Sequence, residues 1–241
     1  MHLCIDIGNT LTKAAVVASG SVVEQSVWRA APAERLAEVM ARFSPDACAV
    51  GCVGHMPAEL DAALEALPCR VVRVNGLTPT PLRFARPDYA SYGADRLAAC
   101  VGAWTEAEGR DLLVVDAGTC ITFDHVSAEG VLMGGNISPG LDLRLLAMHE
   151  HTALLPLVEA DGDAPLVGFD TATAMRGGAK WGVHFEIAGY VKKFLAQHPD
   201  GRVFLGKEPL FDDEIFSDER VRVCKDMVFT GLDKILDYDK N

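Results

Sequence analysis

An aspartate followed by small and polar residues occurs twice in this chain, each time between two apolar runs. The first turn is Asp6–Thr10, which follows the apolar run Leu3–Ile5, and the second turn begins at Asp116. Gly8 lets the backbone approach a ligand, and successive backbone N–H groups in such a turn can bind an anion. A carboxylate at the end of a strand can hold Mg²⁺ or its waters. These residues could bind a phosphate; the alternative is an ordinary tight hairpin turn whose polar residues serve only the turn.

The first turn carries donors and a cation as well. Asn9 and Thr10 offer side-chain and backbone donors, and Lys13 can reach a phosphate as a point charge. The second turn repeats the pattern as Asp116-Ala117-Gly118-Thr119 and continues into the apolar run Cys120–Phe123. Two such hairpins about half a chain apart predict two related domains that face each other across a cleft, each giving one loop to a nucleotide.

A third acidic residue stands where a helix is expected to begin. Gly93-Ala94-Asp95-Arg96 precedes the apolar, helix-forming stretch Leu97–Trp104. Backbone donors at a helix N-terminus favour an anion there. Asp95 can accept a proton from a hydroxyl nucleophile, and Arg96 can clamp a carboxylate or a phosphate through two hydrogen bonds. The alternative is an aspartate cap with an arginine ion pair on an ordinary helix.

The elements that must position these residues are predicted from the pattern of apolar residues. The chain has 241 residues, enough for two compact α/β domains, which we place at 1–109 and 110–241. In the first domain the order of strands (β) and helices (α) is βββαβαβ, which fits an antiparallel hairpin added to a parallel core. The expected strands there are 3–5, 13–18, 21–29, 47–53 and 70–74, and the expected helices are 32–43 and 59–67. We predict that 75–92 is an extended connection leading to a site, the alternative being a surface loop without a role.

The second domain begins with the hairpin at Asp116. A loop is predicted at Gly134–Gly140, because the segment contains three glycines and a proline. These residues suggest that its backbone passes close to another part of the protein or to a ligand. The long helix predicted over 171–197 contains several glycines, which cost a helix interior about 1 kcal/mol each and suggest close approach by another helix or a ligand. The other elements expected in this domain are a helix over 141–149, a loop over 163–169, a strand over 203–205 and a closing helix from 227.

The amino-acid composition and net charge argue against some classes of function. Apolar residues make up 49% of the chain and charged residues 23%, which is typical of a globular protein. The net charge of −12 argues against a nucleic-acid surface, which would need a basic patch, but not against a nucleotide substrate. The apolar runs are too short to cross a membrane, and no secretory signal is present, so we expect a cytoplasmic protein with no nucleic-acid or membrane partner.

Cysteines and histidines do not show a metal pattern. The seven cysteines are odd in number and show no C-x-x-C pair, so we expect reduced residues of the core. His149-Glu150-His151 lacks the H-E-x-x-H spacing that places two rings on one helix face, and is expected to be a polar helix end.

Taken together, the motifs resemble those of the type III pantothenate kinases. Any one of them is weak, but together, in the order of the family, they are specific and extend over nearly the whole chain. They are DIGNT at Asp6–Thr10, GADR at Gly93–Arg96, D-x-GT-x-x-T at Asp116–Thr122, GG-x-I-x-PG at Gly134–Gly140, and a threonine-rich helix start at Thr171 followed by Gly177. The resemblance implies an α/β fold of two ribonuclease-H-like domains of the actin and sugar kinase type, facing each other across a nucleotide cleft.

The family's activity would be transfer of the γ-phosphoryl group of ATP to pantothenate, giving 4′-phosphopantothenate in the first committed step of coenzyme A synthesis. The resemblance implies that Asp95 is the catalytic base. The ATP-binding residues that it implies are Asp6, Ile7, Gly8, Asn9, Thr10, Leu11, Thr12, Lys13 and Thr119. The pantothenate-binding residues that it implies are Tyr89, Tyr92, Gly93, Ala94, Asp95, Arg96 and Thr171.

Cofactors and assembly follow from the same resemblance. Asp6 would lie near Mg²⁺, and Asp116 would bind a monovalent cation, K⁺ or NH₄⁺. Thr171 matches a threonine that contacts pantothenate from the partner subunit, so a homodimer is implied.

Two positions depart from the family pattern. The family's tyrosine seven residues before the first glycine of GADR is Arg86 here, and Tyr89 and Tyr92 both stand close enough to replace it. The expected Gly-Gly pair near the adenosine is Gly206-Lys207, so nucleotide preference could be unusual. The alternative function is a regulatory binder without turnover, since proteins of this fold were first described as accessory factors for transcription; intact Asp6, Asp95 and Asp116 argue against it.

Overall fold

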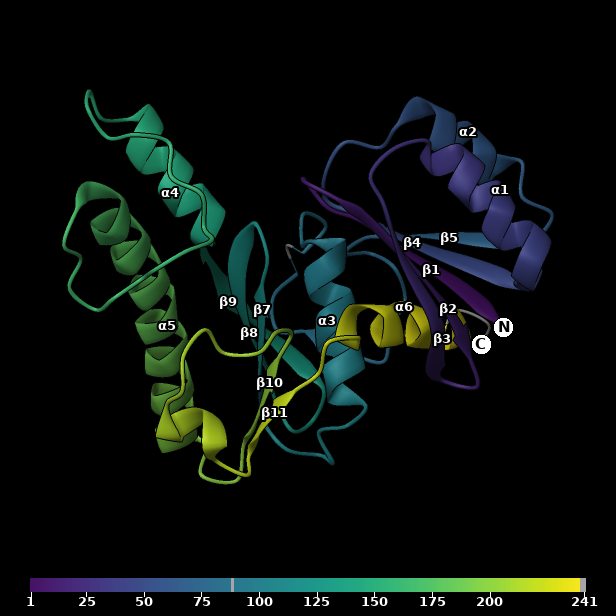
Figure 1. Ribbon diagram of the computed structural model, residues 1–241. Helices are drawn as coiled ribbons and strands as arrows, with labels where there is room; N and C mark the ends of the chain where they lie inside the picture. Colours follow the sequence, from purple (N-terminus) through teal and green to yellow (C-terminus); the bar gives the residue numbers. More distant parts are fainter. Residues whose placement is uncertain (88, 239–241) are drawn as a thin grey trace. The chain divides into compact units, whose positions relative to one another are not determined.

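The computed structural model describes residues 1–87 and 89–238, which form two compact units. Unit 1 comprises 1–109, 126–134 and the described residues of 225–241, and unit 2 comprises 110–125 and 135–224. The predicted division into 1–109 and 110–241 follows chain order, whereas these contacts group the last helix with the first unit. Figure 1 labels most of the helices and strands.

Unit 1 contains a five-stranded sheet in the order β3-β2-β1-β4-β5. Its antiparallel hairpins join β1, β2 and β3, and β4 and β5 continue from β1 in parallel, as the sequence predicted. The strands are β1 (His2–Ile7), β2 (Thr12–Ala18), β3 (Ser21–Trp28), β4 (Ala47–Cys52) and β5 (Arg70–Val74).

The two faces of this sheet are covered by different helices. Leu3, Ile5 and Ile7 of β1 belong to a buried cluster with Leu36 of α1 (Pro32–Phe43) and with residues of α2 (Ala58–Glu65). Alternate residues of a strand point to opposite faces, so His2, Cys4 and Asp6 point to the other side. There the Nδ1 atom of His2 lies 2.7 Å from Oδ1 of Asp233 in α6, which places α6 against that face.

Helices α3 (Ala94–Trp104) and α6 (Met227–Tyr238) pack closely against each other in unit 1. Gly102 and Gly231 stand at their crossing: a Cβ at Gly102 would collide with the carbonyl of Met227, and one at Gly231 with the carbonyl of Ala98. Helix α6 also packs on β1 and β4. This pair of helices therefore covers the face of the sheet to which Asp6 belongs.

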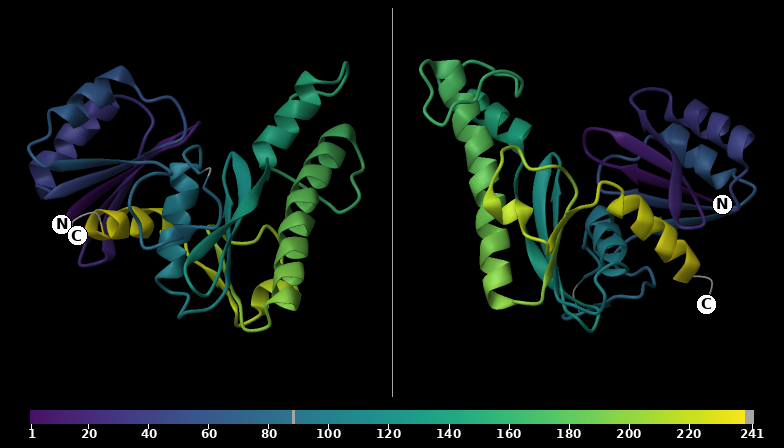
Figure 2. Two further views of the ribbon diagram at one scale, coloured as in Figure 1. Left: turned by 180° about the vertical axis from the view of Figure 1, so that it is seen from behind. Right: turned by 60° about the horizontal axis from the view of Figure 1, so that its bottom comes forward.

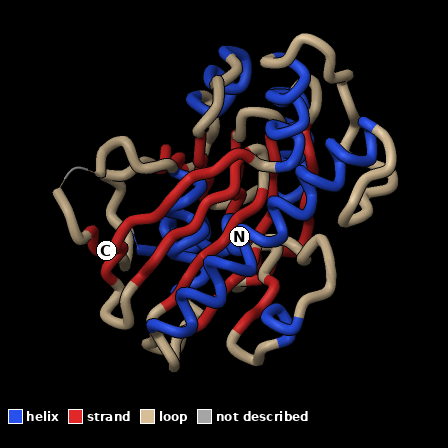
Figure 3. The backbone as a smooth tube through the Cα atoms, turned by 90° about the vertical axis from the view of Figure 1, so that its left-hand side faces the viewer, coloured by secondary structure: helices blue, strands red, loops and turns tan. Residues whose placement is uncertain are grey.

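Unit 2 is built on β7 (Leu112–Ala117), β8 (Cys120–Val126), β9 (Val131–Pro139), β10 (Arg202–Leu205) and β11 (Val221–Val223). Their order is β11-β10-β7-β8-β9. The short strand β6 (Arg83–Phe84) pairs with Val131 and Leu132, the part of β9 that is grouped with unit 1. The long helix α5 (Thr171–Gln197) lies along one face of the sheet (Figures 1, 2 and 3).

The core of unit 2 lies between that face and α5. Leu113 and Val115 of β7 and Ile121 and Phe123 of β8 are buried against apolar residues of α5. The ring of Phe123 stacks on Tyr190, with centroids 3.8 Å apart. Helix α4 (Leu141–Glu150) and a single 3₁₀ turn (Glu214–Ser217) complete the described elements. None of the helices among the described residues has the length and apolar character needed to cross a membrane.

Most predicted elements are present, and the largest error concerns Gly134–Gly140. Residues up to Pro139 form strand β9 rather than a loop, because glycine and polar residues are tolerated in a strand whose outer positions are exposed. The loops predicted over 75–92, apart from β6 and from residue 88, which lies outside the described residues, and over 163–169 are confirmed. Other element ends differ from the predictions by at most three residues, as at the start of α3, which is Ala94 rather than Leu97, and at the end of β8, which is Val126 rather than Phe123.

The expectation for the histidine pair is confirmed. The expectation of core cysteines holds for Cys4, Cys48 and Cys100, whereas the other four are half-buried. All seven cysteines are free, and burial raises the pKa of the Cys4 and Cys48 thiols well above the ordinary range. Helix α4 ends at Glu150 with His151 as its C-cap, so His149 and His151 stand at a helix end.

Candidate functional site

The first acidic turn is tightly closed in unit 1. The backbone N–H of Gly8 donates to the carbonyl of Leu11 over 3.0 Å, and the N–H of Val53 donates to the carbonyl of Ile7 over 3.0 Å. Gly54 follows β4 and packs so closely on Gly8 that a Cβ there would collide with the Gly8 carbonyl. The residues that follow the neighbouring parallel strand β4 therefore support this turn.

Asp6 and Lys13 lie directly opposite each other in the β1–β2 pair. Directly paired residues share one face of a sheet, so the carboxylate and the ammonium group belong to the same side. Asp6 is also paired with Gly51 of β4, and a Cβ at Gly51 would lie 3.6 Å from the Cβ of Ala94 at the start of α3. The first turn and the start of α3 thus lie at the same end of one sheet.

Asp95 stands in the first turn of α3, and its carboxylate lies over the helix N-terminus. Its Oδ1 accepts a hydrogen bond of 2.8 Å from the backbone N–H of Arg96. A Cβ at Gly93, the N-cap, would lie 2.6 Å from that oxygen, so only glycine leaves room for the carboxylate in this position. The helix N-terminus stabilises negative charge at this point. The half-buried Asp95 and Asp6 consequently belong to one end of unit 1.

The two candidate tyrosines differ in their surroundings. Tyr89 stacks on Phe84 with ring centroids 4.0 Å apart, whereas Tyr92 meets Phe84 edge-on at 5.5 Å. The guanidinium carbon of Arg96 lies 4.5 Å from the centre of the Tyr92 ring, a cation–π contact. Tyr92 is therefore joined to the Gly93–Arg96 segment directly, while Tyr89 reaches it through Phe84. The Arg86 side chain, at the position of the family tyrosine, is exposed.

The second acidic turn is closed in the same way in unit 2. Asp116 lies near the end of β7, and the N–H of Gly118 donates to the carbonyl of Cys120 over 2.8 Å. The N–H of Gly140, just before α4, donates to the carbonyl of Thr119 over 2.9 Å. The predicted close approach of the 134–140 segment is thus present at its last residue. Thr119 and Gly118 are exposed, so their outward atoms face solvent.

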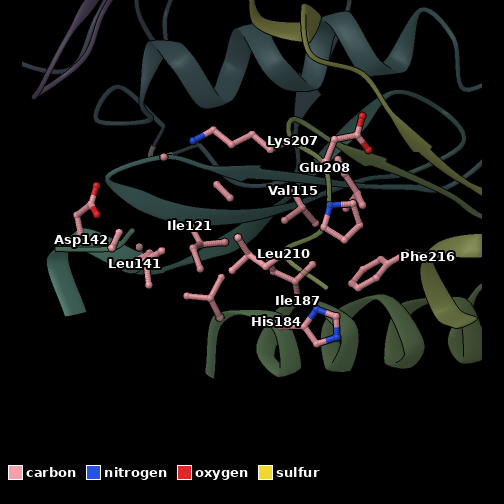
Figure 4. Close-up of a pocket in the computed structure, with 17 residues that line it drawn as sticks. Val115, Ile121, Leu141, Asp142, His184, Ile187, Lys207, Glu208, Leu210 and Phe216 are labelled. Atoms are coloured by element: carbon pink, nitrogen blue, oxygen red, sulfur yellow. The ribbon is translucent and has the colours of Figure 1, made fainter. Parts of the chain in front are cut away.

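A cavity of about 250 Å³ opens beside this turn, also within unit 2. Val115 and Ile121 come from the sheet, Ile187 from α5, and Leu210 and Phe216 from the segment after β10 (Figure 4). The lining is mostly apolar, and its charged members are Asp142, Lys207 and Glu208. Its floor includes His184 of α5, which is 2% exposed and whose Nδ1 has no hydrogen-bond partner among the described residues. A mostly apolar hollow with a few polar groups is the usual form of a small-molecule site.

Thr171 is exposed at the first position of α5. Asp170 caps that helix: its Oδ1 accepts from the N–H of Thr173 over 2.7 Å, and these hydrogen bonds lower the pKa of the Asp170 carboxyl. The loop before the cap exposes Leu166, Val167 and Phe169. The sequence did not predict the cavity lining, because its side chains come from segments far apart in the chain. It did not predict this apolar loop either, because an apolar residue type does not show by itself whether the side chain is buried or exposed.

The donors at the two turns fit the expected cations. Asp6 supplies a carboxylate near the end of β1, beside a closed turn, and Asp116 supplies one near the end of β7, three residues before Thr119. Oxygen donors of this kind suit hard cations such as Mg²⁺ and K⁺.

Comparison with known proteins agrees with the motif pattern. A family model for type III pantothenate kinase matches residues 2–193. This chain belongs to the type III pantothenate kinase family. A type III pantothenate kinase of Bacteroides fragilis is 38% identical over 241 residues, covering 99% of this chain and 98% of that protein.

Solved structures confirm the fold of this pantothenate kinase family member. A Campylobacter jejuni protein described as a Baf family transcriptional activator aligns with a TM-score of 0.59 at 21% identity, covering 99% of both chains. A Sinorhizobium meliloti protein described as a 2-dehydro-3-deoxygalactonokinase aligns with a TM-score of 0.56 at 14% identity, covering 98% of both chains. At such identities the likeness shows the fold alone, which is the predicted α/β fold of the sugar kinase type.

Proposed function

We propose that this protein catalyses ATP-dependent phosphorylation of the primary hydroxyl of pantothenate, giving 4′-phosphopantothenate. One observation supports this beyond family membership: Asp95, on a helix N-terminus, and the Asp6 turn lie at one end of the sheet of unit 1. Phosphoryl transfer depends mainly on positioning, charge neutralisation and a group that accepts the hydroxyl proton. This arrangement offers all three.

In the proposed reaction Asp95 accepts the proton of the pantothenate hydroxyl as the oxygen attacks the γ-phosphorus. Gly93, Ala94 and Arg96 hold the acceptor, with Arg96 directed at its carboxylate. Tyr92 is the better of the two tyrosine candidates, because it contacts Arg96 itself. Backbone donors of residues 6–13, with Lys13, bind the phosphates. A planar base is suited to the apolar cavity beside Thr119.

Cations complete the charge balance of the proposed site. Mg²⁺ near Asp6 would neutralise charge on the β- and γ-phosphates, and K⁺ or NH₄⁺ at Asp116 would do so beside the second turn. The family match supports ATP and pantothenate as substrates. A homodimer, with Thr171 reaching the partner's site, is part of the proposal and is supported by the exposed apolar loop just before Thr171.

The test is an assay of purified protein with ATP, pantothenate, Mg²⁺ and K⁺, followed by mass spectrometry. We expect formation of 4′-phosphopantothenate in step with ADP, and a large loss of rate when K⁺ is replaced by tetramethylammonium. Release of ADP without pantothenate serves as the control for simple ATP hydrolysis. Absence of phosphopantothenate under these conditions would remove the kinase proposal and favour a regulatory binder, whereas equal rates in both salts would remove the monovalent cation site.

A further inference from the structure

Two histidines and an aspartate meet at the end of unit 2 remote from the acidic turn. Oδ1 of Asp111 lies 3.1 Å from Nε2 of His125 and 3.6 Å from Nδ1 of His198. The three donor atoms all lie within 4.8 Å of one another. In a tetrahedral zinc site with bonds near 2.0–2.1 Å, donor atoms are about 3.3 Å apart. The observed spacing is therefore close to that of a metal site without any change of backbone.

The fold brings these three residues together through the alternation of its strands. In β7, Leu113 and Val115 face α5, so Asp111, two residues before Leu113, belongs to the same face. In β8, Ile121 and Phe123 face α5, and His125 continues that series. His198 is the C-cap of α5, one helical turn beyond Phe194. The cluster is thus the polar end of the core that lies between the sheet and α5.

Both rings are held in orientation by one buried aromatic side chain. Phe194 stacks on His198, with centroids 4.6 Å apart, and meets His125 edge-on at 5.5 Å. The backbone is fixed as well: the N–H of Arg202 donates to the carbonyl of Asp111, and the N–H of His198 to that of Phe194. The side chains of the three ligands keep 28–33% exposure, so an ion from solvent can reach them. Fixed ligands with an open side are the arrangement of a preorganised metal site.

We propose that Asp111, His125 and His198 bind a divalent transition metal ion, with Zn²⁺ as the ion of best fit and water in the fourth position. Two imidazole nitrogens and one carboxylate oxygen suit zinc better than Mg²⁺ or Ca²⁺, which prefer oxygen alone. The alternative is an aspartate that only orients two histidines by hydrogen bonding. The His2, Asp233 and Asp237 group is a weaker candidate, since the two carboxylates contact different nitrogens of one ring.

The position of the site indicates what the ion does. Asp111 precedes β7 and Asp116 lies near its other end, so about 16 Å of strand separates the two residues. The ion is consequently no part of the phosphate chemistry. It links the start of β7, the end of β8 and the end of α5, and so stabilises the folded state of unit 2. Metal binding to the folded state alone raises the melting temperature in proportion to the logarithm of metal concentration.

Zinc titration followed by calorimetry and thermal unfolding tests the proposal at neutral pH, with metal-free protein and a thiol-blocking reagent on the accessible cysteines. We expect one Zn²⁺ per chain and a rise in melting temperature. His198→Gln and Asp111→Asn should weaken binding by more than the roughly 10–100-fold that loss of an outer-shell partner costs. His151→Gln removes an exposed histidine at another helix C-cap and should bind as the unaltered protein does. Equal affinity in all these proteins would overturn the site.

A second measurement needs no variant and so does not depend on the folding of one. Diethylpyrocarbonate modifies accessible imidazoles, and mass spectrometry locates the modified histidines. We expect Zn²⁺ to protect His125 and His198 but not His149 or His151. Modification of all four at unchanged rates with Zn²⁺ present would contradict the proposal, even if zinc bound elsewhere on the chain.

Discussion

At the scale of single residues, the position of Asp95 depends on the glycine two residues before it. The carboxylate occupies the space that a Cβ at Gly93 would need, and the backbone N–H of Arg96 donates to it. Together these contacts fix the orientation of the carboxylate at the start of α3. In the proposed reaction this fixed carboxylate accepts the proton of the acceptor hydroxyl as its oxygen attacks phosphorus.

Asp95→Asn keeps the shape and the hydrogen-bond acceptor but removes the base. We expect kcat to fall about 10²–10⁴-fold, the contribution usual for general base catalysis, with ATP binding and the melting temperature nearly unchanged. Steady-state kinetics and nucleotide titration measure both effects. Glu59→Gln, which removes an exposed acidic residue from the first turn of α2 in the same unit, is the matched control and should retain full activity. A fully active Asp95→Asn protein would show that another group is the base.

The sequence predicts the candidate functional residues wherever they lie together in one short segment of the chain. The turns at Asp6 and Asp116 and the Gly93–Arg96 helix start could be predicted because a turn or cap requires particular residues at adjacent positions. The Asp111, His125 and His198 cluster could not, because its members are separated by 14 and 73 residues and meet only through the pairing of strands with α5. The one cue was that Asp111 and His125 continue the alternation of buried positions in their strands.

At the scale of elements, glycine was the hardest residue to interpret. The glycines of 134–140 suggested a loop but lie in strand β9, whose outward positions are exposed. The glycines of α5 suggested close approach: Gly177 does contact the carbonyl of Pro165, whereas nothing lies within 4 Å of a Cβ at Gly178 or Gly189. Sequence alone cannot separate a glycine that a neighbour requires from one that faces solvent.

The crossing of α3 and α6 provides a prediction for the first kind of glycine. Gly231→Ala would place a methyl group against the carbonyl of Ala98 in α3, and backbone cannot move aside as a flexible side chain can. We expect the free energy of unfolding to fall by roughly 1–3 kcal/mol or more, the cost of overpacking a tight core. Urea denaturation followed by circular dichroism measures it.

Gly189→Ala is the matched control in an exposed helix interior. The same substitution there meets open space and removes the backbone entropy of glycine, so we expect the free energy of unfolding to rise by roughly 0.5–1 kcal/mol. The opposite signs distinguish packing from helix propensity. Destabilisation of equal size by both substitutions would contradict the close contact of α3 and α6.

At the scale of the whole molecule, the order of the chain and the composition of its compact units differ. The sequence predicted one hairpin with an acidic turn in each half of the chain, and each unit holds one such turn as expected. Helix α6, however, packs in unit 1 although it is last in the chain. Its apolar pattern showed that it was helical but not which sheet it would cover, because many apolar faces are compatible with one amphipathic helix.

The oligomeric state also belongs to this scale. It determines whether Thr171 contributes to the site of its own subunit or to that of the partner subunit. Leu166, Val167 and Phe169 are 64%, 82% and 77% exposed immediately before α5, more apolar surface than a monomer usually leaves in one short loop. If this loop forms the interface of a twofold dimer, it does so in both subunits, and the exposed Thr171 lies beside the interface. We therefore expect sedimentation analysis to show a dimer, and Val167→Asp with Phe169→Asp to dissociate it.

Complementation then tests whether Thr171 serves the partner's site. Asp95→Asn and Thr171→Arg chains, each inactive alone, are co-expressed with different tags, and the mixed dimer is purified through both tags. If Thr171 reaches across the interface, one site of the mixed dimer carries both changes and the other carries neither. The mixed dimer should then recover about half of the activity of the unaltered enzyme, because one of its two equivalent sites is intact. If Thr171 acts in its own subunit, each site carries one defect and the mixed dimer stays inactive, which would contradict the shared site.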